Sequence, residues 1–214
     1  MRSRLFGLIV VAIAAWNGAF IAAQRFGLFN SVAVAAALLV LRSLAVPTEW
    51  RKLFAPRRDA LVVAAIATPV LVGATLLLRG PVLGAVPALS EGVGQLYAML
   101  GSTTLVQAYV LLPLTAIAEE VVFRGVIQGA LEPRLTRFGA PVAAACIYAA
   151  AHVASENPTL LALALVMGLV WGCLRAFTGS LWPGIASHVL WDLVVMIWSP
   201  LPAVVHAGHS IVVP

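Results

Sequence analysis

Long runs of apolar residues, separated by short stretches that contain arginine, proline or glycine, dominate the chain. About 20 apolar residues are enough for a helix to cross the hydrocarbon core of a membrane. The runs predict spans at residues 5–23, 29–46, 60–78, 113–131, 140–154, 159–177 and 181–198. The predicted fold is therefore all-α, a polytopic transmembrane helical bundle with about seven spans, within a range of six to eight.

The pattern is least regular between residues 80 and 131. Glycine and proline in GPVLGAVPALSEGVG, residues 80–94, disfavour a regular helix and predict a loop or short interfacial segment. The apolar stretch 95–131 is too long for one straight span, and Pro113 is expected to break it. We therefore predict an interfacial or partly inserted helix at 95–112, followed by the fourth span.

The first apolar run and the fifth span each leave an alternative open. The basic start and apolar run of residues 1–23 resemble a signal peptide, but the run is long for one and more spans follow. An uncleaved first span is the favoured interpretation. The fifth span is short, so a complete crossing requires a thinner bilayer or shielding by neighbouring helices.

Composition places the chain in a membrane. Hydrophobic residues make up 62% and charged residues 10%, with a mean hydropathy of +1.03, whereas soluble domains carry about 25% charged residues. We predict one integral-membrane domain over 1–214, with N-terminal spans at 1–79 and a core at about 95–199. The net charge of +5 does not indicate a nucleic-acid partner, because the basic residues are scattered among short loops.

The basic residues also predict orientation. Nine Lys and Arg residues fall on the N-terminal side of the predicted spans, and two, Arg25 and Arg79, fall on the other. The positive-inside rule therefore predicts a multi-pass protein of the cell membrane with a cytoplasmic N-terminus. Residues 46–59, basic and aromatic, are expected at the headgroup level as a topology-setting loop or a lipid or partner site. His206 and His209 are expected to be solvated.

One span carries three charges. The sequence AIAEEVVFRGVIQ, residues 116–128, contains Glu119, Glu120 and Arg124, and each charge near the bilayer centre costs roughly 2.5–3.5 kcal/mol on insertion scales. Glu120 and Arg124 are four residues apart, so they share a helical face and can pair. Glu119 is turned by about 100° from Glu120. This spacing predicts a structural ion pair beside a general base that faces a separate cavity.

Two other spans contain ionisable residues. The fifth contains His152, with Tyr148 one turn earlier, and the seventh contains His188 and Asp192, four residues apart on one face. Ionisable groups within spans normally face the bundle interior and one another. The three spans together predict a buried site of carboxylates and imidazoles.

Two chemistries fit this set. A carboxylate and a histidine can activate water for attack on an amide carbonyl while other donors stabilise the oxyanion. Alternatively, Glu119, His152, His188 and Asp192 hold a divalent metal, with zinc as the expected ion. The H-E-x-x-H pattern is absent, which favours the first chemistry with no cofactor required. Ser187 points away from its neighbour His188 on the helix, so a serine protease is disfavoured.

Three motifs resemble a known family. EEVVFRG resembles the E-E-x-x-x-R motif of the CAAX protease and bacteriocin-processing family (CPBP, or Abi), which includes relatives of type II CAAX prenyl endopeptidases. Tyr148 and His152 match the aromatic-x-x-x-His motif, and His188 and Asp192 match the His-x-x-x-Asn/Asp motif, in the family's order. The resemblance covers residues 119–192 and implies an all-helical intramembrane endopeptidase whose cavity opens to one membrane face.

The resemblance also implies roles for the acidic and basic residues. Glu119 and His152 are expected to activate the water. Glu120 and Arg124 are expected to hold the site together. The remaining two motif residues, His188 and Asp192, are expected to line the oxyanion side.

The chain departs from the family pattern at two positions. Tyr148 replaces the usual phenylalanine and adds a hydroxyl that needs a partner. Asp192 replaces the asparagine of the eukaryotic enzymes, and an ionised aspartate cannot donate a hydrogen bond. We therefore expect Asp192 to orient His188, which becomes the donor. This departure also keeps the metal alternative open.

The resemblance implies a membrane-anchored protein substrate. The bias toward Ala, Val, Leu and Arg is typical of a prokaryotic protein and favours a leader peptide or C-terminal sorting segment over a prenylated tail. Two rival functions remain. The first is a catalytically silent membrane scaffold or immunity protein. The second is a proton-coupled transporter, which buried carboxylates and histidines also suit, although no inverted repeat is evident in the sequence.

Overall fold

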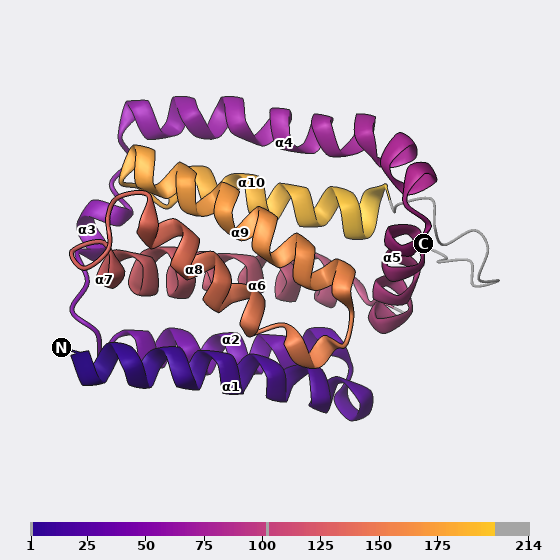
Figure 1. Ribbon diagram of the computed structural model, residues 1–214, viewed down its shortest axis with the longest axis horizontal. Helices are drawn as coiled ribbons and strands as arrows, with labels where there is room; N and C mark the ends of the chain where they lie inside the picture. Colours follow the sequence, from indigo (N-terminus) through magenta and orange to yellow (C-terminus); the bar gives the residue numbers. More distant parts are fainter. Residues whose placement is uncertain (1, 102, 200–214) are drawn as a thin grey trace.

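The computed structural model describes residues 2–101 and 103–199, and every regular element within these ranges is a helix (Figure 1). The chain begins with a hairpin of α1 (Arg2–Phe26) and α2 (Leu28–Ser43), joined at Gly27. Gly27 has a φ of 80°, which glycine adopts without the steric penalty of a side chain. The all-α prediction is confirmed. His206 and His209 lie outside the described residues.

The later helices follow in two groups. The first comprises α3 (Trp50–Leu53), α4 (Arg58–Ala85), α5 (Pro87–Leu100), η1 (Gln107–Leu111), α6 (Leu112–Glu119), η2 (Glu120–Gln128) and α7 (Gly129–Leu131). The second comprises α8 (Gly139–Ala150), η3 (Val153–Ser155), α9 (Pro158–Thr178), α10 (Trp182–Asp192) and η4 (Leu193–Trp198). The segments η1, η2 and η4 are π-helical, and η3 is a 3₁₀ turn.

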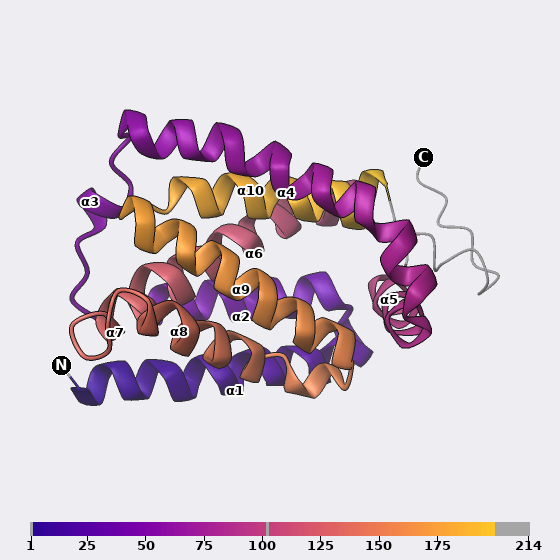
Figure 2. The ribbon, with the colours of Figure 1, turned by 45° about the horizontal axis from the view of Figure 1, so that its top comes forward.

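The long helices pack side by side. The α1–α2 hairpin lies along one side of the bundle and α4 along the opposite side, with α6, α8, α9 and α10 between them (Figures 1 and 2). The shorter α5 lies across one end, away from α3 and α7. This arrangement places α6 and η2 in the interior, where all nine residues of η2 are buried.

Several helices are apolar enough for a multi-pass membrane protein. Three described helices have the length and composition of a span: Ser3–Phe26, Arg58–Ala85 and Pro158–Thr178. Three shorter apolar segments accompany them: Leu28–Ser43, Gly139–Ser155 and Trp182–Trp198. The count of about seven spans, the cytoplasmic N-terminus and the single-domain organisation stay predictions.

Residues 80–94 were expected to form a loop or a short interfacial segment. The loop alternative is wrong, and the interfacial alternative stays a prediction. Helix α4 continues through Pro81 to Ala85, and α5 begins at Pro87. Proline removes one backbone donor from a helix, and at the first helical position that donor has no intrahelical partner anyway. Within residues 80–94 only Val86, between the two helices, is not helical.

The expected break at Pro113 is also wrong. A continuous helical segment runs through η1, α6, η2 and α7, and Pro113 lies within the first turn of α6. The break occurs earlier, at Gly101, whose φ of 59° lies in the left-handed region that favours glycine. The wider π-helical turn of η1 ends two residues before Pro113, and the N–H of Leu112 donates to the Gln107 carbonyl, five residues earlier.

Candidate active site

The interior helix holds the predicted ion pair. Glu120 is fully buried and Arg124 is 1% exposed. Arg124 Nη1 lies 3.4 Å from Glu120 Oε1, which confirms the pairing expected from their spacing. Glu119, the last residue of α6, is also buried. The three charges therefore face other helices and not lipid.

His188 on α10 connects the carboxylates. Its Nδ1 lies 3.1 Å from Glu120 Oε1, and its Nε2 lies 3.6 Å from Glu119 Oε2 and 3.7 Å from Asp192 Oδ2. The hydrogen bond that orients the ring is the one to Glu120, and the orienting role expected for Asp192 stays a prediction. An imidazole whose two nitrogens face carboxylates can donate a proton at one nitrogen and accept one at the other. His188 is therefore placed for proton movement within the cluster.

His152 occupies the turn after α8. Its Nδ1 lies 2.8 Å from the backbone oxygen of Tyr148. When Nδ1 carries the proton and donates to this carbonyl, Nε2 is left as an acceptor. The ring packs against Phe20 and Trp16, with centroid distances of 5.5 and 6.3 Å. Within the described part of the chain, no direct hydrogen bond joins His152 to Glu119, the expected pair.

Tyr148 links these two residues instead. Its hydroxyl donates a hydrogen bond to Glu119 Oε2, and its ring lies 4.6 Å from the His152 ring, centroid to centroid. The hydroxyl that distinguishes this chain from the usual phenylalanine therefore has a carboxylate as its partner. Tyr148 connects His152 to the cluster of the other predicted site residues.

Trp171 on α9 is a site residue that the sequence reasoning missed. Its ring stacks on the His188 ring with centroids 3.6 Å apart and planes 18° from parallel. The signal in the sequence was Gly168 and Gly172, four residues apart around the tryptophan, because small residues at this spacing allow helices to approach closely. A Cβ on Gly168 would lie 3.2 Å from Tyr148 Cδ1.

Gly184 on α10 is a second residue at the site that the sequence reasoning missed. A Cβ at this position would overlap Glu120 Oε2 and lie 3.2 Å from Glu120 Cδ. Helix α10 can bring His188 to Glu120 at this distance only because residue 184 has no side chain. Gly184 therefore determines how closely the third motif approaches the first.

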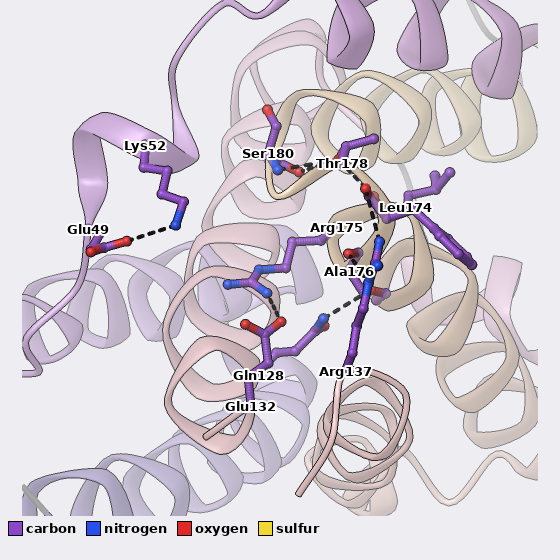
Figure 3. A network of polar contacts seen from close by, with 12 residues as sticks. Glu49, Lys52, Gln128, Glu132, Arg137, Leu174, Arg175, Ala176, Thr178 and Ser180 are labelled. Carbon is purple, nitrogen blue, oxygen red and sulfur yellow. Dashed lines mark hydrogen bonds and ion pairs between the residues drawn. The ribbon is translucent and has the colours of Figure 1, made fainter. Parts of the chain in front are cut away.

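A second polar network holds these helices together at the end of the bundle near α3 (Figure 3). Gln128 Nε2 donates to the Gly172 carbonyl at 2.9 Å, and Arg175 forms an ion pair with Glu132. Arg137 Nε donates to the Ala176 carbonyl at 3.0 Å, near the end of α9. These contacts attach η2 and the segment between α7 and α8 to α9, so the motif helices have a defined register.

Helix α3 is attached to the turn between α9 and α10. Trp182 Nε1 donates to the Phe54 carbonyl at 3.0 Å, and Ser180 Oγ donates to the Leu53 carbonyl at 3.3 Å. The headgroup-level segment predicted at 46–59 thus contacts the N-terminal end of the helix that carries His188 and Asp192.

The residues proposed as alternative zinc ligands were Glu119, His152, His188 and Asp192. Among the residues that the structure describes, no group of three or more His, Cys, Asp or Glu side chains is arranged to hold a metal ion. The metal alternative and the metal-free alternative both stay predictions.

Comparison with family models matches residues 101–194 to the Rce1-like type II CAAX prenyl endopeptidases. The matched segment contains all three motifs and follows helices α1 to α5. Comparison with curated proteins gives no significant match, and neither does comparison with solved structures. Residues 101–194 therefore form an Rce1-like domain of the CPBP, or type II CAAX prenyl endopeptidase, family.

Proposed function

We propose that this chain is an intramembrane endopeptidase that hydrolyses a peptide bond in a membrane-anchored protein. The observation that carries the proposal is the buried cluster of Glu119, Glu120 and His188, which lies in a domain of a peptidase family. Ionisable groups in an apolar bundle are costly and normally serve a function.

Glu119 and His152 are the proposed bases for the hydrolytic water. Tyr148 and His188 both approach Glu119 Oε2, and no hydrogen bond to Glu119 Oε1 is found among the described residues. His152 retains Nε2 as an acceptor when Nδ1 donates to the Tyr148 carbonyl. A water between these two acceptors would be oriented by both, which supports shared activation where direct contact is absent.

The proposed reaction proceeds through attack of water on the scissile carbonyl, followed by cleavage of the C–N bond. Glu119 takes a proton from the water, and the resulting hydroxide attacks the scissile carbonyl carbon. His188, held at Nδ1 by Glu120 and with Asp192 beside Nε2, donates from Nε2 to the oxyanion that forms. The C–N bond then breaks, and the proton held by Glu119 passes to the leaving amine. The products are a carboxylic acid and an amine, as hydrolysis requires.

The proposed substrate is a leader peptide or a C-terminal sorting segment attached to the membrane. The comparison of membrane proteomes from cells with wild-type protein and cells with Glu119→Gln tests the function. Glutamine keeps the size of the side chain but cannot take up the proton, so an uncleaved precursor is expected to accumulate.

The matched control is Glu91→Gln, which makes the same change at an exposed position of α5. We expect this variant to leave the proteome unchanged. If Glu119→Gln is stably inserted and no precursor accumulates, the protease proposal fails, and a binding role such as a scaffold or immunity protein becomes the better explanation.

We further propose that cleavage needs no metal. The purified protein is expected to process the accumulated precursor equally well before and after treatment with a strong zinc chelator, because carboxylate and imidazole bases replace the metal in activating water. The measurement is the rate of product formation. Loss of activity that added zinc restores would contradict this part of the proposal.

A further inference from the structure

Tyr148 contacts two charged residues with different parts of its side chain. The hydroxyl donates to Glu119 Oε2, while the face of the ring lies 4.3 Å from Arg124 Cζ. This second distance is within the range of a cation–π interaction, which is stronger for desolvated groups. Both contacts are buried, and Tyr148 itself is only 5% exposed.

The position of Arg124 determines which glutamate is neutralised. Arg124 pairs with Glu120, and among the described residues no ion pair joins it to Glu119. The two glutamates are adjacent in sequence, so a long and flexible arginine side chain could in principle reach either. A base that is paired with a guanidinium gives up part of its tendency to accept a proton. Two rings lie against the guanidinium beside Glu120: that of Tyr148 and, at the longer distance of 5.3 Å from Arg124 Cζ, that of Trp171.

The ring itself has little freedom to move. Phe123 packs edge-on against Tyr148, with centroids 4.8 Å apart. Helix α9 also approaches the ring so closely that a Cβ on Gly168 would lie 3.2 Å from Tyr148 Cδ1 and 3.3 Å from Arg124 Nη2. Because this packing holds the ring in place, the hydroxyl has a fixed position beside Glu119.

We propose that Tyr148 is a positioning residue that keeps the two glutamates in different roles. Its hydroxyl orients the carboxylate of Glu119 so that Oε1 faces the water, and its ring keeps Arg124 with Glu120. The kinetic consequence depends on the proposed protease function, whereas the link between the hydroxyl and Glu119 does not.

The link is tested by thermal unfolding of the purified full-length protein in detergent. Tyr148→Phe removes the hydroxyl and keeps the ring, so Glu119 loses a donor and Tm is expected to fall by roughly 3–12 °C. In a Glu119→Leu background the hydroxyl has no acceptor, and its removal is expected to leave Tm unchanged or raise it. If Glu119→Leu does not fold, Glu119→Gln serves as the second background, where the drop is expected to be about half as large.

Tyr97→Phe is the matched control. Tyr97 is also buried, and its hydroxyl donates to the Val195 backbone oxygen at 2.5 Å. Its removal is expected to lower Tm by the same amount in both backgrounds. An equal drop for Tyr148→Phe with and without Glu119 would overturn the proposal, because the hydroxyl would then act through some other group.

The kinetic arm uses the precursor that accumulates in Glu119→Gln membranes. Tyr148→Phe is expected to lower kcat roughly 10- to 100-fold with little change in KM, since a charged hydrogen bond is lost at the base and not at the substrate. An unchanged kcat would contradict the positioning role. If wild type cleaves nothing, the protease proposal fails, and the unfolding measurements still decide whether Tyr148 positions Glu119.

Discussion

Glu120→Gln is expected to lower Tm by roughly 6–20 °C, because breaking a buried ion pair costs about 3–5 kcal/mol. Glu120 is fully buried, and its carboxylate faces both Arg124 Nη1 at 3.4 Å and His188 Nδ1 at 3.1 Å. Glutamine fills the same space but leaves the Arg124 guanidinium buried without a counter-ion. The measurement is thermal unfolding of the detergent-solubilised protein.

The ion pair between Lys52 and Glu49 provides the control. Its atoms are 3.2 Å apart, but the two side chains are 67% and 78% exposed. Exposed pairs contribute about 0–1 kcal/mol, so Glu49→Gln is expected to change Tm by no more than about 4 °C. Similar shifts for Glu49→Gln and Glu120→Gln would show that the buried pair does not stabilise the bundle.

Gly184→Ala is expected to abolish cleavage and to destabilise the protein by about 1–3 kcal/mol, the typical cost of an added methylene in a packed core. The new Cβ would overlap Glu120 Oε2, so either α10 moves away from η2 or the carboxylate rotates. Either response separates His188 from Glu120. The measurements are Tm and the rate of precursor processing.

Gly73→Ala makes the same change in the middle of α4, where a Cβ would meet no atom within 4 Å. Alanine is favoured over glycine in helices by about 0.5–1 kcal/mol, so this control is expected to keep full activity and to be equally or slightly more stable. Full activity in Gly184→Ala would mean that the close approach of α10 to Glu120 is not needed for function.

The contacts within single helices could be predicted from the sequence. Glu120 and Arg124 pair because their spacing puts them on one face of a helix, and His188 and Asp192 lie near each other for the same reason. The sequence also predicts that three helices bring their ionisable residues to one buried cluster, because charged side chains in apolar helices have no favourable alternative to the bundle interior.

Helix boundaries around glycine and proline were less predictable. Gly101 and Pro113 both disfavour a continuous helix, and only the backbone conformation shows that the chain breaks at Gly101. The strength of a helix breaker depends on whether neighbouring helices and π-helical turns compensate for the missing hydrogen bond. Helix α4 also continues through Pro81.

The sequence by itself determined that the chain is helical and apolar, that its charges gather in three helices, and which charged residues share a helical face. Only the tertiary structure decided the contacts between helices: the Tyr148 hydroxyl with Glu119, the Trp171 ring on His188, and Gly184 against Glu120. The physical reason is that spacing along one helix is set by its regular geometry. Contacts between helices depend instead on the register and distance at which their side chains interlock.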